Sequence, residues 1–540
     1  MTFKNTTVQN RSKQERLNNS HTIPSHYFDG PEVSKFLSYL LALPHGKEEI
    51  LYCLGKYLLG KNKNPSLKKF LSEYEFGEIN FVNVPSNEFD LLGTAYQYLN
   101  SKMENLEKGS FYTGKGIALD FVNDLDFDSG QTILDPACGS GSFLFRSNAK
   151  PEQIYGVDAD PIAVMIAKFN YFIKFPEAGY PNLYCQDFFA WFAENEDLRF
   201  DYVIGNPPYG ANLDLAKIPS QYIFSGESFS YFIEFCFWLL KEDGVFRFLL
   251  PEAILNVKRH SDVRNFILKY TNLKRIKRYS SKFAGVMSDV YMLELDKSKS
   301  PRMIFEDKDK TSIPKSIFKG LKNQIFVNLN KVDISIIEKV EKIQKYDLSE
   351  SIFGLGVVTG DNKTKLTLVK ESGMEHIYTG KEVEKYQLLP PKHFIRFERD
   401  KLQQVAPDAI YRAPEKLIYQ TISKYLKISL DTSKSLTSNS ANIFIPNVPG
   451  MDIYEVLGLL NSDLYTYLHF KLFGGVNKIA RENLMALPLP SLSPENHKKL
   501  RALVQEVIRT KDDRPLQDFV NLEIFDLTKE EVIYMESIFK

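Results

Sequence analysis

The sequence Asn206-Pro-Pro-Tyr209 combines residue types that can hold a flat molecule bearing an amine. Two consecutive prolines fix the backbone φ angle and remove two N–H donors, so they favour a rigid turn with outward carbonyls. The Asn206 side-chain oxygen and the Pro207 carbonyl would accept both N–H bonds of an exocyclic NH2 group, while the Tyr209 ring lies against its plane. A Pro-Pro pair often marks an ordinary turn. This one directly follows the apolar run at residues 202–204, which favours a functional corner at the end of a buried strand.

A glycine turn in Asp135-Pro-Ala-Cys-Gly139-Ser-Gly141 also follows an apolar run, at residues 132–134. Glycine lets the backbone approach a ligand closely, and a helix expected after the turn would offer unpaired N–H groups. Any tight strand-to-helix turn can use Gly-x-Gly, so the pair alone is weak. A dinucleotide-binding fold is the first competing interpretation, although Leu144 stands where the third glycine of Gly-x-Gly-x-x-Gly belongs.

Acidic residues follow the next two expected strands. Asp158 ends the first of them, where a carboxylate can accept hydrogen bonds from both hydroxyls of a ribose. Asp187, followed by Phe188, comes after the second, where an acid and an aromatic ring could bind an adenine amino group and stack on its ring. The structural alternative is that Asp158 or Asp160 caps the helix expected to start at Pro161.

The elements that must position these residues follow an alternating pattern. From about residue 110 to 296, short apolar runs alternate with longer helical patterns, which predicts βαβ units and a doubly wound α/β sheet. Residues 30–108 carry apolar residues at helical spacing. Residues 296–315 are rich in Lys, Asp, Ser and Pro, which predicts a linker or long loop. In the C-terminal half we expect helices near residues 334–345, 454–472 and 496–510.

We therefore expect four consecutive parts in the 540 residues. They are an N-terminal helical region (1–108), an α/β domain carrying the motifs (109–296), a linker (297–345), and a C-terminal mixed α/β domain with terminal helices (346–540). Residues 1–25 are polar and expected to be mobile.

The composition is that of an ordinary globular protein, with 43% apolar and 25% charged residues. No window approaches the ~18 consecutive apolar residues of a membrane span, and the N-terminus lacks the apolar segment of a secretory signal. The four cysteines are far apart and lack metal or disulfide spacing. We expect no metal site, no membrane partner and a reducing, cytoplasmic setting.

The net charge of zero hides an uneven distribution. Residues 101–250 carry 11 basic and 21 acidic side chains, whereas residues 251–500 carry 40 and 28. Within residues 256–282, nine basic side chains stand against one acid, Asp262. Such a region would attract a polyanion such as nucleic acid, while the plainer interpretation is a solvated surface with chance clustering.

The order of these motifs resembles that of amino-methyltransferases that use S-adenosylmethionine. The glycine turn, Gly-Val-Asp158, Asn-Pro-Pro-Tyr209 and an upstream Gly-Ser-Phe-Tyr-Thr113, with a long C-terminal extension, are typical of the gamma-class, TaqI-like adenine-N6 DNA methyltransferases of restriction–modification systems. The resemblance covers roughly residues 90–296 and implies a class I, Rossmann-like methyltransferase domain at 109–296. Short stretches at 411–416, 459–463 and 486–490 are similar to pieces of the family's target-recognition domain, which 346–540 would form.

The resemblance also implies roles by position. Asn206, Pro207 and Tyr209 would be catalytic, and Phe283 would join Asn206 and Tyr209 in holding the substrate base. Gly114 departs from the family pattern, which usually has proline after the threonine. The basic run at residues 258–282 would flank the DNA side. The candidates for cofactor binding are Thr113, Asp135, Ala137, Gly139, Asp158, Asp187, Phe188 and Pro207.

The activity implied is methyl transfer from S-adenosylmethionine to the N6 amino group of an adenine flipped out of double-stranded DNA. Hydrogen bonds to Asn206 and Pro207 would aim the amine nitrogen, with no strong general base and no covalent intermediate. DNA would be the partner, alongside a separate cognate restriction endonuclease. We expect no nuclease within residues 1–108, which lack a convincing carboxylate cluster with a Glu-x-Lys-type pair.

Four alternatives stay open. Cytosine-N4 methylation needs the same pair of acceptors but more often goes with Ser in place of Asn206. Enzymes that methylate protein glutamine or RNA guanine-N2 also carry Asn-Pro-Pro-Tyr, typically in shorter chains. A non-enzymatic DNA-binding module is the plainest alternative, and the intact cofactor and catalytic turns argue against it.

Overall fold

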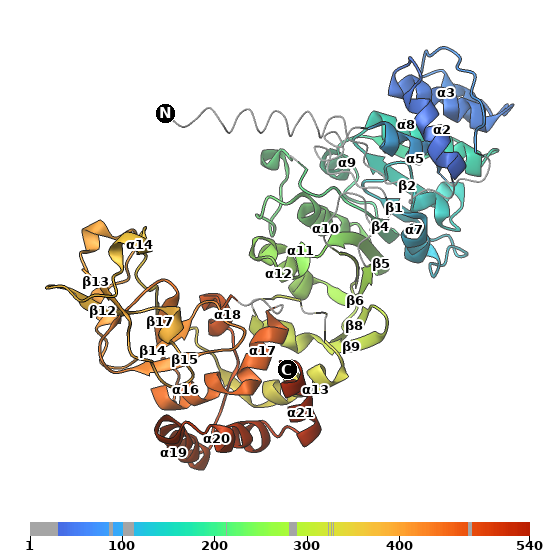
Figure 1. The fold of residues 1–540 in the computed structure, drawn as a ribbon. Coiled ribbons are helices and arrows are strands. Elements are labelled where there is room, and N and C mark those ends of the chain that lie inside the picture. Colours follow the sequence, from blue (N-terminus) through green and yellow to red (C-terminus); the bar gives the residue numbers. More distant parts are fainter. Residues whose placement is uncertain are drawn as a thin grey trace. The chain divides into compact units, whose positions relative to one another are not determined.

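The computed structural model of the chain describes residues 31–85, 90–100, 113–211, 213–279, 289–321, 323–325, 327, 329–473 and 478–539. The chain forms two compact units, Met1–Ser312 and Ile313–Lys540, and each is described here by itself (Figure 1). The unit boundary falls inside the segment expected as a linker, and the finer domain limits remain predictions. Residues 1–25 and Phe283 lie outside the described residues.

The first unit is built on a nine-stranded sheet of order β3-β2-β1-β4-β5-β7-β6-β8-β9. The first five strands in this order, β3, β2, β1, β4 and β5, run parallel to one another. β7 runs antiparallel to both of its neighbours, β5 and β6. This order, with a single reversed strand between β5 and β6, is that of the class I methyltransferase fold, so the predicted doubly wound α/β class is confirmed. The strands are β1 (Ile133–Asp135), β2 (Ile154–Asp158), β3 (Asn182–Cys185), β4 (Phe200–Gly205), β5 (Leu240–Pro251), β6 (Asn272–Tyr279), β7 (Val290–Asp296), β8 (Arg302–Glu306) and β9 (Lys310–Pro314).

Helices cover both faces of this sheet, which explains why the central strand β1 is buried along its whole length. In Figure 1, α8 and the N-terminal helices lie on one side, and α10 and α12 lie on the other. The longest, α8, starts where Asp160 caps it and Pro161 occupies its first turn. The helices of this unit are α2 (Pro31–Leu41), α3 (Lys47–Leu59), α4 (Pro65–Leu71), α5 (Leu91–Leu99), α7 (Lys115–Val122), α8 (Pro161–Lys174), α9 (Phe188–Glu194), α10 (Ser228–Trp238), α11 (Ala253–Asn256) and α12 (Ser261–Tyr270), with short 3-10 turns η2 (Leu144–Arg146), η3 (Pro151–Gln153), η4 (Leu215–Lys217) and η5 (Lys258–His260).

The N-terminal helices share one hydrophobic core with the sheet. Buried residues of α2, α3, α4 and α5 pack together with those of α7, α8, β1 and β2. The contact between α3 and α8 is close, because a Cβ at Gly55 would lie 2.5 Å from the Phe169 ring. The described part of residues 30–108 is therefore largely helical, as expected. These helices pack directly against the rest of the sheet domain.

The prediction of a linker or long loop at residues 296–315 is wrong for most of this segment, because β8 and β9 extend the sheet there. β9 lies at the edge of the sheet, where one flank faces water and polar residues are tolerated. The polarity of Lys310-Thr-Ser-Ile-Pro314 thus marks a sheet edge rather than a loop.

The second unit holds smaller sheets of order β11-β17-β14-β15, β13-β12-β16 and β10-β18. Expected helices appear as α13 and α19, but the one expected at 454–472 is two, because Ser462 ends α16 and caps α17. None of the described helices is long and apolar enough to cross a lipid bilayer. The elements are η6 (Lys315–Leu321), α13 (Lys331–Ile343), β10 (Gln344–Tyr346), β11 (Ile352–Gly354), α14 (Asn362–Lys365), β12 (Glu375–Tyr378), η7 (Gly380–Glu382), β13 (His393–Ile395), η8 (Arg399–Lys401), α15 (Asp408–Tyr411), β14 (Lys416–Gln420), β15 (Ile428–Asp431), β16 (Leu436–Thr437), β17 (Ala441–Ile445), α16 (Ile453–Asn461), α17 (Asp463–Leu472), α18 (Arg481–Met485), β18 (Leu489–Pro490), α19 (Pro494–Thr510), α20 (Arg514–Asp518), the π-helical turn η9 (Phe519–Ile524) and α21 (Lys529–Ser537).

Candidate active site

A cavity of about 490 Å³ lies where the chain leaves the carboxyl ends of the parallel strands. Its walls come from the segments that follow β1, β2, β3 and β4. The strand order reverses between β1 and β4, and open α/β sheets bind ligands at such a reversal. We call the segment Asn206–Tyr209 the proline corner. Gly139 of the glycine turn and Asn206 of the proline corner both line this one cavity.

The glycine turn needs glycine for two different reasons. Gly139 and Gly141 have φ angles of +54° and +85°, which side chains disfavour. A Cβ at Gly141 would also lie 2.1 Å from the Phe145 ring, whereas at Gly139 it would meet no atom within 4 Å. The backbone at Gly139 is thus open on the cavity wall, as close approach of a ligand requires.

The helix expected directly after this turn is reduced to the three-residue turn η2. The polar stretch at residues 147–151 ends it, with the Ser147 hydroxyl donating to the Leu144 carbonyl at 2.6 Å. This turn therefore lacks the helix N-terminus that was expected to offer unpaired N–H groups to a ligand.

Asp158 and Asp160 have different structural tasks at the end of β2. Asp158 accepts hydrogen bonds from the backbone N–H groups of Gly139, at 2.8 Å, and of Asp160, at 2.9 Å. Asp160, not Asp158, caps α8 by accepting from the Ile162 N–H at 3.0 Å. Asp158 therefore holds the glycine turn against β2 while its carboxylate lines the cavity.

The remaining acids of the cavity lie at the ends of β1 and β3. Asp135 is buried and accepts from the Ala137 N–H at 3.1 Å. Burial raises the pKa of Asp135 well above its usual value, and nearby Asp158 adds to the rise. Asp187 caps α9, and the adjacent Phe188 ring stacks on Phe232 with centroids 4.9 Å apart. Asp187 and Phe188 therefore present an acid and a flat apolar wall to the same space.

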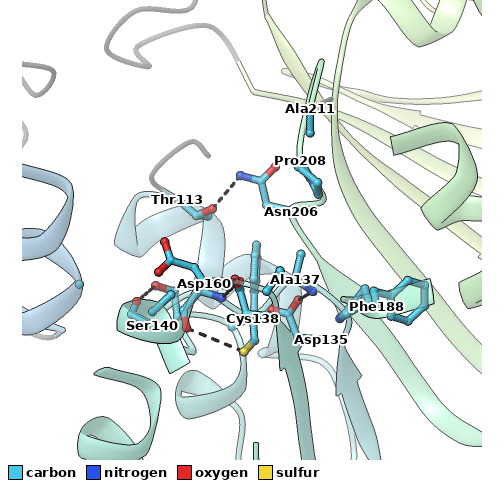
Figure 2. A pocket seen from close by; sticks show the side chains of 18 of the residues that line it. Thr113, Asp135, Ala137, Cys138, Ser140, Asp160, Phe188, Asn206, Pro208 and Ala211 are labelled. Atoms are coloured by element: carbon cyan, nitrogen blue, oxygen red, sulfur yellow. Dashed lines mark hydrogen bonds between the residues drawn. The ribbon is translucent and has the colours of Figure 1, made fainter. Parts of the chain in front are cut away.

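The Asn206 amide is held at both ends. Its Nδ2 donates to Thr113 Oγ1 at 3.2 Å, and its Oδ1 accepts from the Tyr209 hydroxyl at 2.6 Å. Figure 2 shows the bond between Asn206 and Thr113, with Pro208 and Ala211 beside it. The Tyr209 hydroxyl also lies 2.7 Å from the Leu249 carbonyl, but it has one proton and donates to one oxygen at a time.

The proline corner contributes to the cavity unevenly. Asn206 and Pro208 line it, whereas Pro207 and Tyr209 are not among the lining residues. Pro207 is buried and Tyr209 is half-buried. Of the cofactor candidates expected from the sequence, Thr113, Asp135, Ala137, Gly139, Asp158, Asp187 and Phe188 all line the cavity.

α5 lies in the region expected to be helical, but its part in the cavity was not predicted. It supplies Gly93, Tyr96 and Gln97 to the cavity wall. The Tyr96 hydroxyl donates to Asp160. An N-cap residue before a periodic apolar run was the available signal for this helix, since Asp90 occupies that position.

Asp90 ties α5 to the glycine turn. The buried carboxylate accepts from the Gly93 N–H at 2.8 Å, Asn170 Nδ2 at 2.7 Å, the Ser142 hydroxyl at 3.0 Å and the Ser140 hydroxyl. Burial raises the pKa of Asp90 despite these bonds. One side chain thus links the N-terminal helices, α8 and the turn that lines the cavity.

Two segments of the chain match known protein families. Residues 152–283, in the first unit, match the Eco57I restriction-modification methylase family, and residues 375–489, in the second, match the TaqI-like C-terminal specificity domain. In these two segments the chain is similar to the TaqI-like restriction–modification methyltransferases. Its motifs, its strand order and both family matches agree on this similarity.

Relatives of this methyltransferase include type II and type I modification enzymes. It is 27% identical to type II methyltransferase M.VspI of Vibrio sp. (strain 343) over 62% of its own chain and 85% of that protein. It is 34% identical to the type I restriction enzyme MjaIX methylase subunit of Methanocaldococcus jannaschii, over 26% of each chain. The match therefore spans about a quarter of that archaeal subunit.

A solved structure shares the fold of the methyltransferase over most of its length. The type IIL restriction-modification enzyme MmeI, solved in complex with DNA, aligns over 94% of both chains with a TM-score of 0.52 and 11% sequence identity. At this identity the likeness concerns the fold alone.

The fold and family imply S-adenosylmethionine as the methyl donor, and the cavity suits such a molecule. The open backbone at Gly139 leaves room for a ligand at the turn. The carboxylates of Asp158 and Asp187 suit the hydroxyls and amino groups of a nucleoside, and the Phe188 ring offers a flat surface for its base.

Much of the basic run is neutralised within the fold, and the expectation that it flanks DNA remains a prediction. Arg264 is buried and donates to the carbonyls of Ile254 and Val257. Four cations of β6 pair with acids on neighbouring segments, a compensation that the local sequence does not show. These pairs include Lys274–Glu294, Arg275–Glu294, Lys277–Asp120, Lys277–Glu306, Arg278–Asp289 and Arg278–Asp307.

Proposed function

We propose that this methyltransferase transfers a methyl group from S-adenosylmethionine to the N6 amino group of an adenine rotated out of duplex DNA. The observation that carries the proposal is the single cavity lined by both Gly139 and Asn206. A glycine turn suited to a nucleoside and a corner suited to an amine thus face the same space, as direct methyl transfer between two bound molecules requires.

In this proposal, the cofactor half of the cavity is formed by the strand-end residues. Asp158 accepts from the ribose hydroxyls with lone pairs not used by Gly139 and Asp160. Asp187 faces the adenine amino group of the cofactor, and Phe188 packs against its ring. Thr113, Asp135 and Ala137 border the same molecule. When bound, S-adenosylmethionine supplies an electrophilic methyl group on its sulfonium.

The other half of the cavity would hold the substrate amine. Asn206 Oδ1 and the Pro207 carbonyl accept the two N–H bonds of adenine N6, which localises the nitrogen lone pair and aims it at the methyl group. As the base binds, the Tyr209 proton shifts from Asn206 Oδ1 to the Leu249 carbonyl, 2.7 Å away. The amine becomes acidic only once it is methylated, and its proton then leaves to solvent.

Duplex DNA is proposed as the substrate, and adenine as the target base. The region matching a TaqI-like specificity domain supports a DNA reader in the second unit. Asn206, rather than Ser, at the first position of the corner favours adenine over cytosine. A separate cognate endonuclease remains a prediction.

The test is methyl transfer from isotopically labelled S-adenosylmethionine to duplex DNA, RNA and protein in parallel. The DNA is taken from a strain without endogenous methylation and is digested to nucleosides after the reaction. We expect label in N6-methyldeoxyadenosine. Label in N4-methyldeoxycytidine would contradict the choice of base, and label in RNA or protein but not in DNA would contradict the proposal as a whole. Long-read sequencing of the same DNA gives the recognition site.

A further inference from the structure

The apolar side chain of Phe224 is exposed to solvent although its backbone is fixed by the fold. Its side chain is 74% exposed, although the residue before it, Ile223, is only 1% exposed. Next to them, the Tyr222 ring packs against Trp238, Phe266 and Tyr270. The backbone on the N-terminal side of Phe224 is therefore anchored in the core, and only the phenyl ring projects.

The tip that carries Phe224 is also fixed from α12 and η5. The Asp262 carboxylate accepts from the backbone N–H groups of Phe224 and Ser225, both at 2.7 Å. Arg259 Nε donates to the Ser225 carbonyl at 2.9 Å. A hydrophobic side chain on a pliable loop would fold back onto the protein, whereas these bonds hold the backbone in place.

The same segment is joined to the proline corner. Glu227 Oε1 accepts from the Gly210 N–H at 2.7 Å, and the Ser228 hydroxyl donates to the Pro208 carbonyl at 2.5 Å. Phe224 precedes Glu227 by three residues, a span of at most about 11 Å. The exposed ring thus lies in the segment that connects β4 to α10, close to the corner that would receive the base.

We propose that Phe224 is a wedge that enters the DNA base stack and fills the space left when the target adenine rotates into the cavity. Apolar side chains that insert between bases unstack them and stabilise the deformed duplex. The ring can stack on either neighbouring base pair, and exposed Arg259 beside it suits the phosphate backbone. The inference rests on the proposed function and adds to it a residue that opens the duplex.

The test compares Phe224→Ala with the wild-type full-length enzyme on two duplexes that contain the recognition site. One duplex is fully paired, and the other has an abasic site opposite the target adenine, so that rotating the adenine breaks no base pair. We expect Phe224→Ala to lower kcat/KM at least tenfold on the paired duplex but less than threefold on the abasic duplex. Phe224→Leu, which keeps an apolar wedge, should recover part of the loss.

Two controls separate this role from others. Tyr57→Ala removes another exposed aromatic ring of the first unit and should leave both rates unchanged. The affinity of Phe224→Ala for S-adenosylmethionine should equal that of the wild type. Equal losses on the two duplexes, or no loss on either, would overturn the wedge while leaving the methyltransferase proposal intact. If Phe224→Ala keeps its kcat/KM on both duplexes but changes the oligomeric mass of the enzyme, Phe224 would instead contact another protein chain. A wild-type enzyme that methylates neither duplex would overturn both proposals.

Discussion

At the scale of single residues, the proposed chemistry depends on the orientation of one amide. The Asn206 side chain can accept substrate N–H bonds only if its oxygen, not its nitrogen, faces the substrate. Thr113 takes the nitrogen end and Tyr209 the oxygen end, so the orientation is set before any substrate arrives. Such pre-organisation removes the need to reorient a dipole during the reaction.

Tyr209 should therefore have two separable roles. Tyr209→Phe removes the bonds to Asn206 and Leu249 but keeps the ring, and we expect the single-turnover methylation rate to fall by about three- to tenfold, the scale of one hydrogen bond. Tyr209→Ala also removes the ring, which the sequence predicts to stack on the substrate base, and should cost a further ~10-fold or more. Rapid-quench measurement of label transfer to DNA checks both values. A rate for Tyr209→Ala equal to that of Tyr209→Phe would remove stacking from the account.

At the scale of elements, the cavity depends on a helix that lies upstream of every motif. Asp90 at the start of α5 binds both serines of the glycine turn and Asn170 of α8. The N-terminal helices therefore shape the cavity as well as covering the sheet.

Asp90→Ala should weaken both folding and cofactor binding. It leaves buried donors of Gly93 and Asn170 without their acceptor, which should lower the unfolding free energy of the first unit by about 2 kcal/mol. The loosened turn should raise the Kd for S-adenosylmethionine at least ~5-fold. Thermal denaturation and titration calorimetry give the two quantities, with Asp128→Ala, an exposed carboxylate, as the control. A normal Kd in a folded Asp90→Ala variant would show that α5 does not position the turn.

The site residues that could be predicted from the sequence lie in contiguous segments where a strand leads into a turn. Gly139, Asp158, Asp187 and Asn206 each follow a strand of a parallel sheet, and the carboxyl ends of such strands meet at one edge. Asp90 was missed because its side-chain partners, Ser140, Ser142 and Asn170, lie 50 or more residues away along the chain. The charge compensation on β6 was missed for the same reason, since the acids come from other segments.

At the scale of the whole molecule, the boundary between the two units also separates the two family matches. The methylase match lies in the first unit and the specificity-domain match in the second. Because much of the basic run is paired internally, charge clustering in the sequence is a poor guide to where this enzyme would contact DNA.

The second unit should lose stability in acid through His469. Burial lowers the pKa of His469 from 6.5 to about 4, so between these values the unfolded chain binds a proton that the folded chain does not. This stabilisation is present above pH 6.5 and is lost as pH falls through 4, amounting to roughly 3 kcal/mol at most. Denaturant unfolding from pH 7 to 4 should show a smaller decline in His469→Phe than in the wild type. Identical pH profiles would exclude His469 as the cause.

The central claim is that one cavity joins a cofactor half to an amine-binding half that can be disabled separately. Asn206→Ala tests it, with two measurements on one protein sample: the Kd for S-adenosylmethionine and the rate of methyl transfer to duplex DNA. We predict a Kd within threefold of the wild type and a transfer rate at least ~10²-fold lower, the scale for losing one aimed polar group. An unchanged rate would contradict the account, as would loss of cofactor binding together with activity.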